Sequence, residues 1–543
     1  MIRYFFILLF VVVSLQLFSQ AQVWQWSVPV RGATREGATA YLWIPEDAAQ
    51  IKGVILAQNN MEEICILESS VFRGTMKKLS FAIVWVSPFF DHLFRFDQGA
   101  DEVLDGFMAD LAKVSGYDEL NFVPFVTIGH SAAASWPYYY AARHPERTLC
   151  ALSVSGQWPY FRDPKFAPDI WGSRNIDSIP CLQTMGEYEA AANMAKIGVK
   201  QRSEHPLIPL SMLACPGEGH FSTTEKKNKY FCLYIEKAAQ YRYPKNYDGR
   251  SPARLRAVDP LNSGWLMERW DSGKPASAPP APVHQYKGDR SQAFWFFDEE
   301  MVRATQTYQS TTQTLPQLVG IEQDGQLLPQ RNTHLQLHPQ FLPKEDGITF
   351  HLKGVFYDTV PGGSPRPQSW TGLPVGTKIG HSSQGSPFIE WGGGPWKKLD
   401  DTTFRFYMRN GENGRKDKYS LIFIASHPGD DRYKAAFQQA EMLVPVKNNG
   451  GVSQNIHFPA IPVLKNKTKR IRLNAVSDQG LLVQYYVESG PAFIEGNVLM
   501  LTKIPPKAKL PIKVSVAAWQ YGIPGKVQSA QPVKQHFFIP FTR

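Results

Sequence analysis

The N-terminal half of this chain alternates short, strongly apolar runs with longer helical stretches, and this alternation restricts the fold more than any other feature. The apolar runs have the length of strands that are buried on both faces of a sheet. They cover residues 38–44, 53–58, 81–87, 122–128, 149–154, 180–185 and 208–214. Helices are predicted between them, over 99–115, 132–144, 188–198 and 224–241. Strands that alternate with helices predict an α/β domain with a mostly parallel sheet over residues 22–250.

A chain of 543 residues is expected to hold two or three domains. The residues after 250 lack the alternation of apolar runs and helical stretches that is seen before them. Residues 251–290 form a Pro/Ala-rich linker with aromatic flanks, which predict that it packs back on a domain. Residues 291–460 contain short β-like runs between Gly and Pro turns, which favour a β-rich, sandwich-like domain. Residues 461–543 form a basic terminal β module, which resembles the small immunoglobulin-like modules appended to exported bacterial enzymes.

The first 21 residues are typical of a secretory signal peptide. Arg3 precedes an apolar run over residues 4–18, and Ser19-Gln20-Ala21 forms a small-residue cleavage pattern. The run is too short to span a membrane, and no later stretch is long and apolar enough to do so. We therefore expect a secreted or periplasmic protein without a membrane span. The five cysteines show no metal-binding spacing, and they are expected to be buried small hydrophobes with at most one disulfide among them.

The net charge of +10 is concentrated at the C-terminal end. Residues 465–543 contain twelve Lys or Arg and three acids, so this segment alone has a net charge of +9. A basic module can be a solvated surface, or it can attract an anionic polysaccharide such as a uronic-acid polymer. Export argues against a nucleic-acid partner.

The candidate catalytic serine lies in a turn at residues 129–133. A buried strand leads into Gly129-His130-Ser131-Ala132-Ala133, and a helical stretch follows. This sequence resembles the nucleophile elbow of the α/β-hydrolase family, in which a serine is exposed on a strained strand-to-helix turn and small residues flank it at two positions before and after. The resemblance implies that Ser131 is a nucleophile. Pro137 is expected to kink the following helix.

A serine needs a base and an acid, which follow it in that family in the order serine, acid, histidine. His220 lies in the loop CPGEGHF, directly after the strand predicted over 208–214, and is the expected general base. Glu189 lies three residues after Gly186, where the resemblance implies the triad acid, and Glu187 is the alternative acid. His92 and His205 also lie in predicted loops and are the alternatives to His220.

An acyl-transfer site also needs hydrogen-bond donors for the oxyanion. The resemblance implies the backbone N–H of Ala132, which follows the nucleophile, and an N–H from the loop after residues 53–58. Met61 is the expected donor in that loop, with Asn60 next. Asn59 or Asn60 can instead shape the turn, because Asn tolerates left-handed backbone angles.

No nucleotide-binding or metalloprotease motif is present in the sequence, and the expected mechanism requires no cofactor or metal. The sequence thus predicts an exported serine hydrolase, in the form of a carbohydrate esterase that acts through a Ser-His-Glu triad on an ester-bearing polymer. The open alternatives are a peptidase on the same fold, and a non-catalytic protein that binds glycans or surfaces.

Overall fold

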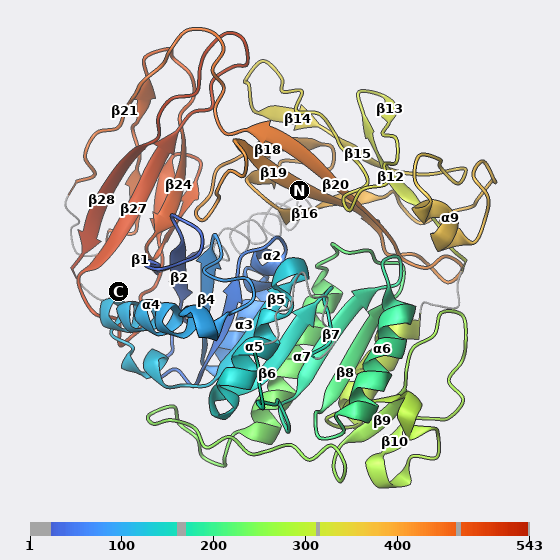
Figure 1. Ribbon diagram of the computed structural model, residues 1–543. Helices are drawn as coiled ribbons and strands as arrows, with labels where there is room; N and C mark the ends of the chain where they lie inside the picture. The colour runs from blue at the N-terminus through green and yellow to red at the C-terminus, as the bar shows by residue number, and fades with distance from the viewer. Residues whose placement is uncertain (1–22, 160–169, 311–314, 463–467, 541–543) are drawn as a thin grey trace, which may run out of the picture.

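The computed structural model describes residues 23–159, 170–310, 315–462 and 468–540. The proposed signal peptide lies outside these residues. The described chain folds into an α/β domain with two further β regions packed against it (Figure 1). None of its helices is long and apolar enough to cross a membrane.

The α/β domain is built on one eight-stranded sheet with the order β1-β2-β4-β3-β5-β6-β7-β8. All pairs from β4 to β8 are parallel, while β1 and β2 are antiparallel to their neighbours. This order, with helices between parallel strands, is that of the α/β-hydrolase fold, as predicted. The strands are β1 (Trp26–Pro29), β2 (Thr39–Trp43), β3 (Gly53–Gln58), β4 (Phe81–Ser87), β5 (Phe125–His130), β6 (Thr148–Val154), β7 (Cys181–Gly186) and β8 (Leu210–Cys215). The helices are α2 (Glu63–Leu67), α3 (Ser70–Leu79), α4 (Ala100–Ser115), α5 (Trp136–Arg143), α6 (Ala191–Glu204) and α7 (Glu225–Arg242).

The Pro/Ala-rich segment 251–290 is folded against the α/β domain. It contains β9 (Trp265–Glu268) and β10 (Ala281–Pro282), which form a sheet with β11 (Ala293–Phe296), and α8 (Glu299–Gln309) follows. The Ser211 hydroxyl on β8 donates to the carbonyl of Trp295 at 2.6 Å, and the Trp295 side chain is buried. The aromatic flanks of this segment therefore belong to the core of the α/β domain.

The next region, which we call the roof (residues 319–445), consists of short antiparallel strands and one short helix around a separate apolar core. Its elements are β12 (Val319–Gln323), β13 (Gln326–Leu327), β14 (Thr349–His351), β15 (Lys353–Phe356), α9 (Arg366–Thr371), β16 (Phe388–Gly393), β17 (Trp396–Lys398), β18 (Thr403–Phe406), β19 (Lys418–His427) and β20 (Ala436–Pro445). The roof lies over the C-terminal ends of the parallel strands (Figure 1). A Cβ on Gly217, just after β8, would lie 1.9 Å from the carbonyl oxygen of Ala435, so the two regions are in tight contact there.

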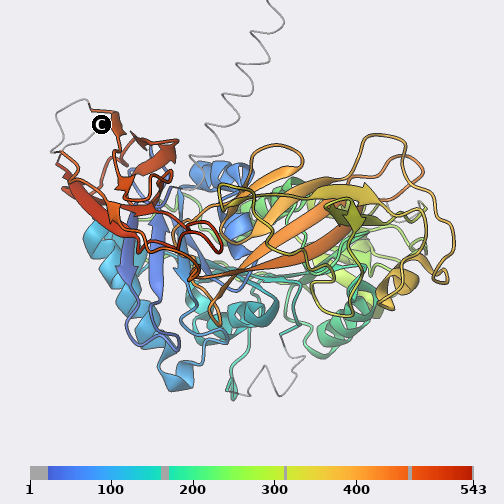
Figure 2. The same cartoon turned by 90° about the horizontal axis from the view of Figure 1, so that it is seen from above.

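The C-terminal module lies beside β1, β2 and α4 (Figure 2). Its main sheets are two three-stranded antiparallel sheets, β22-β26-β25 and β24-β27-β28. Its apolar core is continuous with that of the α/β domain, and Lys507 forms an ion pair with Glu119 at 2.6 Å. The strands are β21 (Ile456–His457), β22 (Arg470–Arg472), β23 (Val476–Ser477), β24 (Gln484–Ser489), β25 (Ala492–Glu495), β26 (Val498–Leu501), β27 (Ile512–Trp519) and β28 (Val533–Ile539).

Two local expectations need correction. The five cysteines are buried, as expected, but all are free thiols, so the single disulfide that the sequence allowed is not formed. Pro137 does not kink α5, because the helix begins only at Trp136 and Pro137 lies in its first turn. An N–H there has no partner inside the helix, so proline removes no hydrogen bond.

Candidate active site

Ser131 occupies the turn between β5 and α5, in a backbone conformation that supports the resemblance to a nucleophile elbow. Its φ is +55°, in the left-handed region that is uncommon for a residue with a side chain. It begins a short 3₁₀ turn, Ser131–Ala133. A Cβ on Gly129 would lie 1.9 Å from the carbonyl oxygen of Ala133, so this sharp turn can form only with glycine at that position.

His220 and Glu189 come together from two neighbouring loops. Glu189 follows β7 and His220 follows β8, and the Nδ1 of His220 lies 2.6 Å from Oε1 of Glu189. The two loops cross closely, because a Cβ on Gly186 would lie 2.3 Å from the carbonyl oxygen of Gly219. The histidine side chain is buried, with 4% of its surface exposed, while the glutamate retains 24%.

The environment keeps His220 neutral, which a general base requires. Burial lowers the pKa of His220 well below its ordinary value, and the positive charges of Arg366 and Lys227 and the nearby His334 act in the same direction. Burial also raises the pKa of Glu189 to about 7. The Nε2 of His220 is buried and makes no hydrogen bond within the described chain, so the Ser131 hydroxyl is not bonded to it in this structure. Such contacts often tighten only when substrate binds.

The other acid and histidines named from the sequence have different partners. Glu187 accepts hydrogen bonds from the backbone N–H of Gly217 at 2.8 Å and the hydroxyl of Ser272 at 2.8 Å, and it pairs with Lys434 at 3.0 Å. It therefore ties the His220 loop to the roof. His92 stacks on Phe89, and His205 ends α6.

The oxyanion donors expected after β3 are already engaged. The backbone N–H groups of Asn60 and Met61 both donate to Oε2 of Glu63 at 2.9 Å, while the N–H of His130 donates to Oε1 at 2.8 Å. To bind an oxyanion, the N–H of Asn60 or Met61 would have to divide its hydrogen bond between the oxyanion and the Glu63 carboxylate, or give up the bond to Glu63. Ala132 is exposed beside Ser131. All three oxyanion assignments stay predictions.

The roof contributes residues to this site that the sequence did not indicate. The ring of His334 lies against that of His220, with 3.8 Å between the centroids. Gln439 of β20 fixes this contact, because its amide donates to the His334 carbonyl at 2.7 Å and its oxygen accepts from the N–H of Phe221 at 3.2 Å. No local pattern distinguishes these residues, since they lie more than 110 positions beyond His220 in a β-rich region.

Glu189, His220 and His334 also form the one group within the described chain whose side chains could together hold a metal ion. One potential ligand atom from each lies within 4.8 Å of the others. Two of the three are the proposed triad acid and base, so an ion bound there would occupy the reaction centre.

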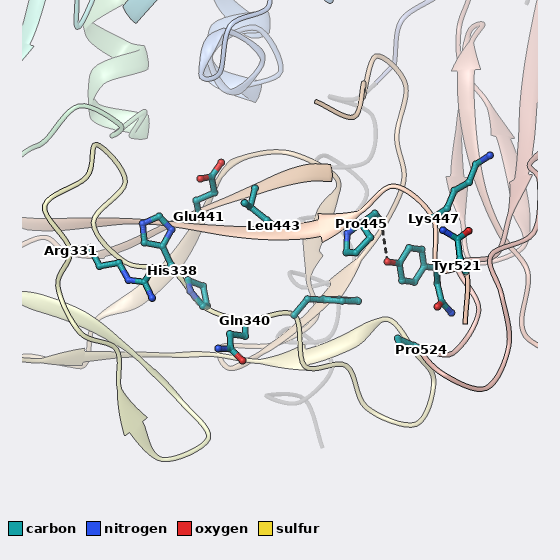
Figure 3. Close-up of a pocket in the computed structure, with 13 residues that line it drawn as sticks. Arg331, His338, Gln340, Glu441, Leu443, Pro445, Lys447, Tyr521 and Pro524 are labelled. Carbon is teal, nitrogen blue, oxygen red and sulfur yellow. Dashed lines mark hydrogen bonds between the residues drawn. The ribbon is translucent and has the colours of Figure 1, made fainter. Parts of the chain in front are cut away.

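A hollow lies at the end of β20 that is remote from Gln439 (Figure 3). It has a volume of about 640 Å³ and is lined by Arg331, His338, Tyr521 and neighbouring residues from β20 and the C-terminal module. None of the residues named for the triad lines it. Strand β20 thus contributes Gln439 to the candidate active site and Leu443 to this hollow.

Known proteins offer similarity in fold only. No protein-family model matches the sequence, and no curated protein matches it. Among solved structures, a carboxylesterase from Bacillus cereus is 14% identical, covers 38% of this chain and 96% of its own, and has a TM-score of 0.27. A poly(3-hydroxybutyrate) depolymerase from Bordetella parapertussis is 12% identical over 44% of this chain and 93% of its own, with a TM-score of 0.29. An S-formylglutathione hydrolase from Agrobacterium tumefaciens is 13% identical over 40% and 93%, with a TM-score of 0.30. At these values, the activity of this chain has to be inferred from its own residues.

Proposed function

We propose that this chain is a serine hydrolase of carboxylic esters, with Ser131 as nucleophile, His220 as general base and Glu189 as the acid that orients the histidine. The observation that carries the proposal is the 2.6 Å contact between His220 and Glu189 at the ends of β8 and β7. It occurs beside a serine with a φ of +55° at the end of β5. Three groups on three strand ends of one parallel sheet are the arrangement that this chemistry needs.

The reaction would proceed in two steps. Nε2 of His220 takes the proton of Ser131 while the serine oxygen attacks the ester carbonyl, and the proton then passes to the departing alcohol as the carbon–oxygen bond breaks. Water attacks the resulting acyl-serine, His220 takes a proton from that water, and the carboxylic acid leaves with the serine restored. Glu189 holds the imidazole in one tautomer and stabilises the imidazolium that forms.

We further propose that the protein is exported and acts on an acylated polysaccharide. The signal-peptide pattern supports export, and the basic segment 465–543 suits an anionic polymer. One of these positive charges is already paired with the α/β domain, since Lys507 forms an ion pair with Glu119.

The first test is labelling of the mature protein with a fluorophosphonate, which reacts with activated serines. Wild type and Ser155→Ala should be labelled, and Ser131→Ala should not. Ser155 is the matched control because it also follows a strand with a positive φ, of +48°, and its hydroxyl donates to the His220 carbonyl at 3.0 Å. Labelling that survives in Ser131→Ala contradicts the assignment, and an unlabelled but folded wild type contradicts the activity. Paired ester and amide substrates then separate an esterase from a peptidase.

A further inference from the structure

Arg366 is a cation beside the candidate active site that forms no ion pair within the described chain, although the Glu189 carboxylate lies near enough to oppose the lowering of its pKa by burial. It is the first residue of α9 and half-buried. Its guanidinium donates to the His334 carbonyl at 3.5 Å, and the His334 ring in turn lies against His220. No carboxylate in the described parts of the chain lies within ion-pair distance of it. By contrast, the roof cations Lys434 and Arg409 have such partners, Glu187 and Glu68.

The position of Arg366 is fixed by the way α9 packs on the acid loop. The ring of Trp370 stacks on Tyr188, with 4.9 Å between centroids and 21° between planes. The indole N–H of Trp370 also donates to the Tyr188 carbonyl at 2.8 Å. Tyr188 directly precedes Glu189, so the helix that carries the arginine is attached to the loop that carries the proposed triad acid. The backbone that carries Arg366 is therefore fixed beside the proposed triad acid, and its side chain reaches the His334 carbonyl from there.

The charge of Arg366 acts in two directions on the proposed triad, because it favours the ionised form of Glu189 and disfavours a positive charge on His220. Burial is the main cause of the lowered pKa of His220 and of His334, and the field of Arg366 adds to both shifts, so it disfavours the imidazolium that His220 must become. Burial also lowers the pKa of Arg366 itself, which shows that the protein partly desolvates this charge. An anion bound to the guanidinium would give the cation an ion-pair partner and would weaken its field at His220.

We infer that Arg366 binds a carboxylate of the substrate, so that the preferred ester carries a negative charge close to the bond that is cleaved. The inference rests on the proposed function and narrows its substrate class to acidic esters. Planar guanidinium matches a carboxylate through two parallel hydrogen bonds, which lysine cannot reproduce. The bound carboxylate would serve both to anchor the substrate and to favour proton transfer to His220.

The test uses two matched pairs of small esters. 4-Acetoxybenzoate and 4-acetoxybenzamide differ by a charge on the alcohol side, and monomethyl succinate and methyl succinamate differ by a charge on the acyl side. We compare kcat/KM for wild type, Arg366→Gln and Arg366→Lys. Arg331→Gln is the matched control, because it removes the same charge from the roof at the hollow of Figure 3.

Arg366→Gln should lower kcat/KM for the charged member of at least one pair by about tenfold or more, as for loss of a charge-assisted hydrogen bond. The same variant should leave kcat for the neutral member unchanged or raise it, since the repulsion at His220 is gone. Arg366→Lys should retain only part of the wild-type kcat/KM for the charged ester. Arg331→Gln should leave the ratio of kcat/KM between the charged and the neutral member of each pair as in wild type. An equal loss on charged and neutral esters would show that Arg366 is merely structural, and no loss on either would overturn the inference.

A binding measurement separates this inference from the proposed function. Titration calorimetry of 4-acetoxybenzoate with Ser131→Ala and with Ser131→Ala/Arg366→Gln does not depend on turnover. Binding that disappears with the arginine supports the anion site even if no ester is hydrolysed. Equal binding, or none to either protein, contradicts the anion site even if fluorophosphonate labelling succeeds.

Discussion

The α/β sheet and the roof contribute to the candidate site in different ways. Ser131, Glu189 and His220 each lie within five residues of the end of a parallel strand, so their positions follow from the local strand–loop unit. His334 and Arg366 reach the same place from long loops and a six-residue helix in a region with its own apolar core. The sheet would thus supply the reacting groups, while the roof determines which molecules can meet them.

This division has a physical reason. Parallel strands that end at one edge bring their loops together whatever the rest of the chain does, so a reaction centre can form from residues far apart in sequence. The roof meets these loops only through specific contacts, such as Gln439 with Phe221 and Lys434 with Glu187. Substitutions in the sheet loops should therefore change the rate of the chemical step, and substitutions in the roof should change selectivity or stability.

The sharpest test of this division compares His220 with His334, whose rings touch. His220→Ala should lower kcat for ester hydrolysis by roughly 10³- to 10⁴-fold, because no other group can take the serine proton. His334→Ala should lower kcat/KM by about tenfold or less, because it removes a neighbour and not the base. Steady-state kinetics with a neutral ester measure both. A loss of similar size in His334→Ala would mean that the roof takes part in the chemistry.

The sequence predicted the sheet well because its signals are local. The runs 53–58 and 81–87 match β3 and β4 residue for residue, and the elbow could be found from five consecutive residues. The helix after the elbow was predicted four residues too early, because Ser131–Ala133 forms a 3₁₀ turn before α5 begins. Chain order, the three-residue offset from Gly186 and the loop after β8 together favoured Glu189 and His220, and these two side chains are in contact.

The contribution of the roof to the site could not be predicted in this way. The position of His334 depends on the packing of β20 against the His220 loop, and that of Arg366 on one aromatic stack between Trp370 and Tyr188. These contacts join residues 105 and 182 positions apart, and neither partner carries a distinctive pattern. The engagement of the Asn60 and Met61 N–H groups by Glu63 was likewise invisible, because a glutamate three residues on is ordinarily a solvated side chain.

The second prediction separates the two candidate acids. Glu189→Gln should lower kcat by at least 10²-fold, since the imidazolium loses its counter-charge. With the pKa of Glu189 raised to about 7, wild-type activity should fall as pH drops through that range while the carboxylate becomes protonated, and the variant should lack this decline. A pH profile of kcat/KM measures both effects.

Glu187→Gln is the matched control for that experiment. It leaves kcat within about threefold but lowers the free energy of unfolding by roughly 1–3 kcal/mol, because Lys434 loses its ion partner. If Glu187→Gln abolishes activity in a folded protein while Glu189→Gln does not, the assignment of the acid is reversed.

The third prediction tests the attachment of the roof. Glu68 of the α/β domain and Arg409 of the roof form a buried ion pair at 2.5 Å, and the Trp24 indole also donates to Glu68 at 2.9 Å. Arg409→Met should lower the free energy of unfolding by about 3–5 kcal/mol, because it leaves a buried carboxylate unpaired. Chemical denaturation measures this loss. The double variant Glu68→Gln/Arg409→Met should regain part of it, and a double variant as unstable as the sum of two independent losses would contradict the pairing.

The last prediction concerns Glu62, a fully buried acid on the sheet side of the site whose Oε2 lies 3.4 Å from Nε2 of His130. Burial raises its pKa to about 8, although Lys227 and Thr223 oppose the shift. The folded protein then holds this proton more tightly than the unfolded chain does. The contribution of the protonated carboxyl group to the free energy of unfolding is therefore complete below about pH 4.5 and is lost as pH rises towards 8. Glu62→Gln removes this dependence, and its stability relative to wild type should increase between those pH values by a few kcal/mol at most, on the order expected for such a shift. Thermal unfolding of both proteins at pH 5, 6.5 and 8 measures the difference in stability between Glu62→Gln and wild type. A difference that is flat with pH would mean that Glu62 is ionised throughout this range, and that the sheet side of the site holds a permanent negative charge beside His130.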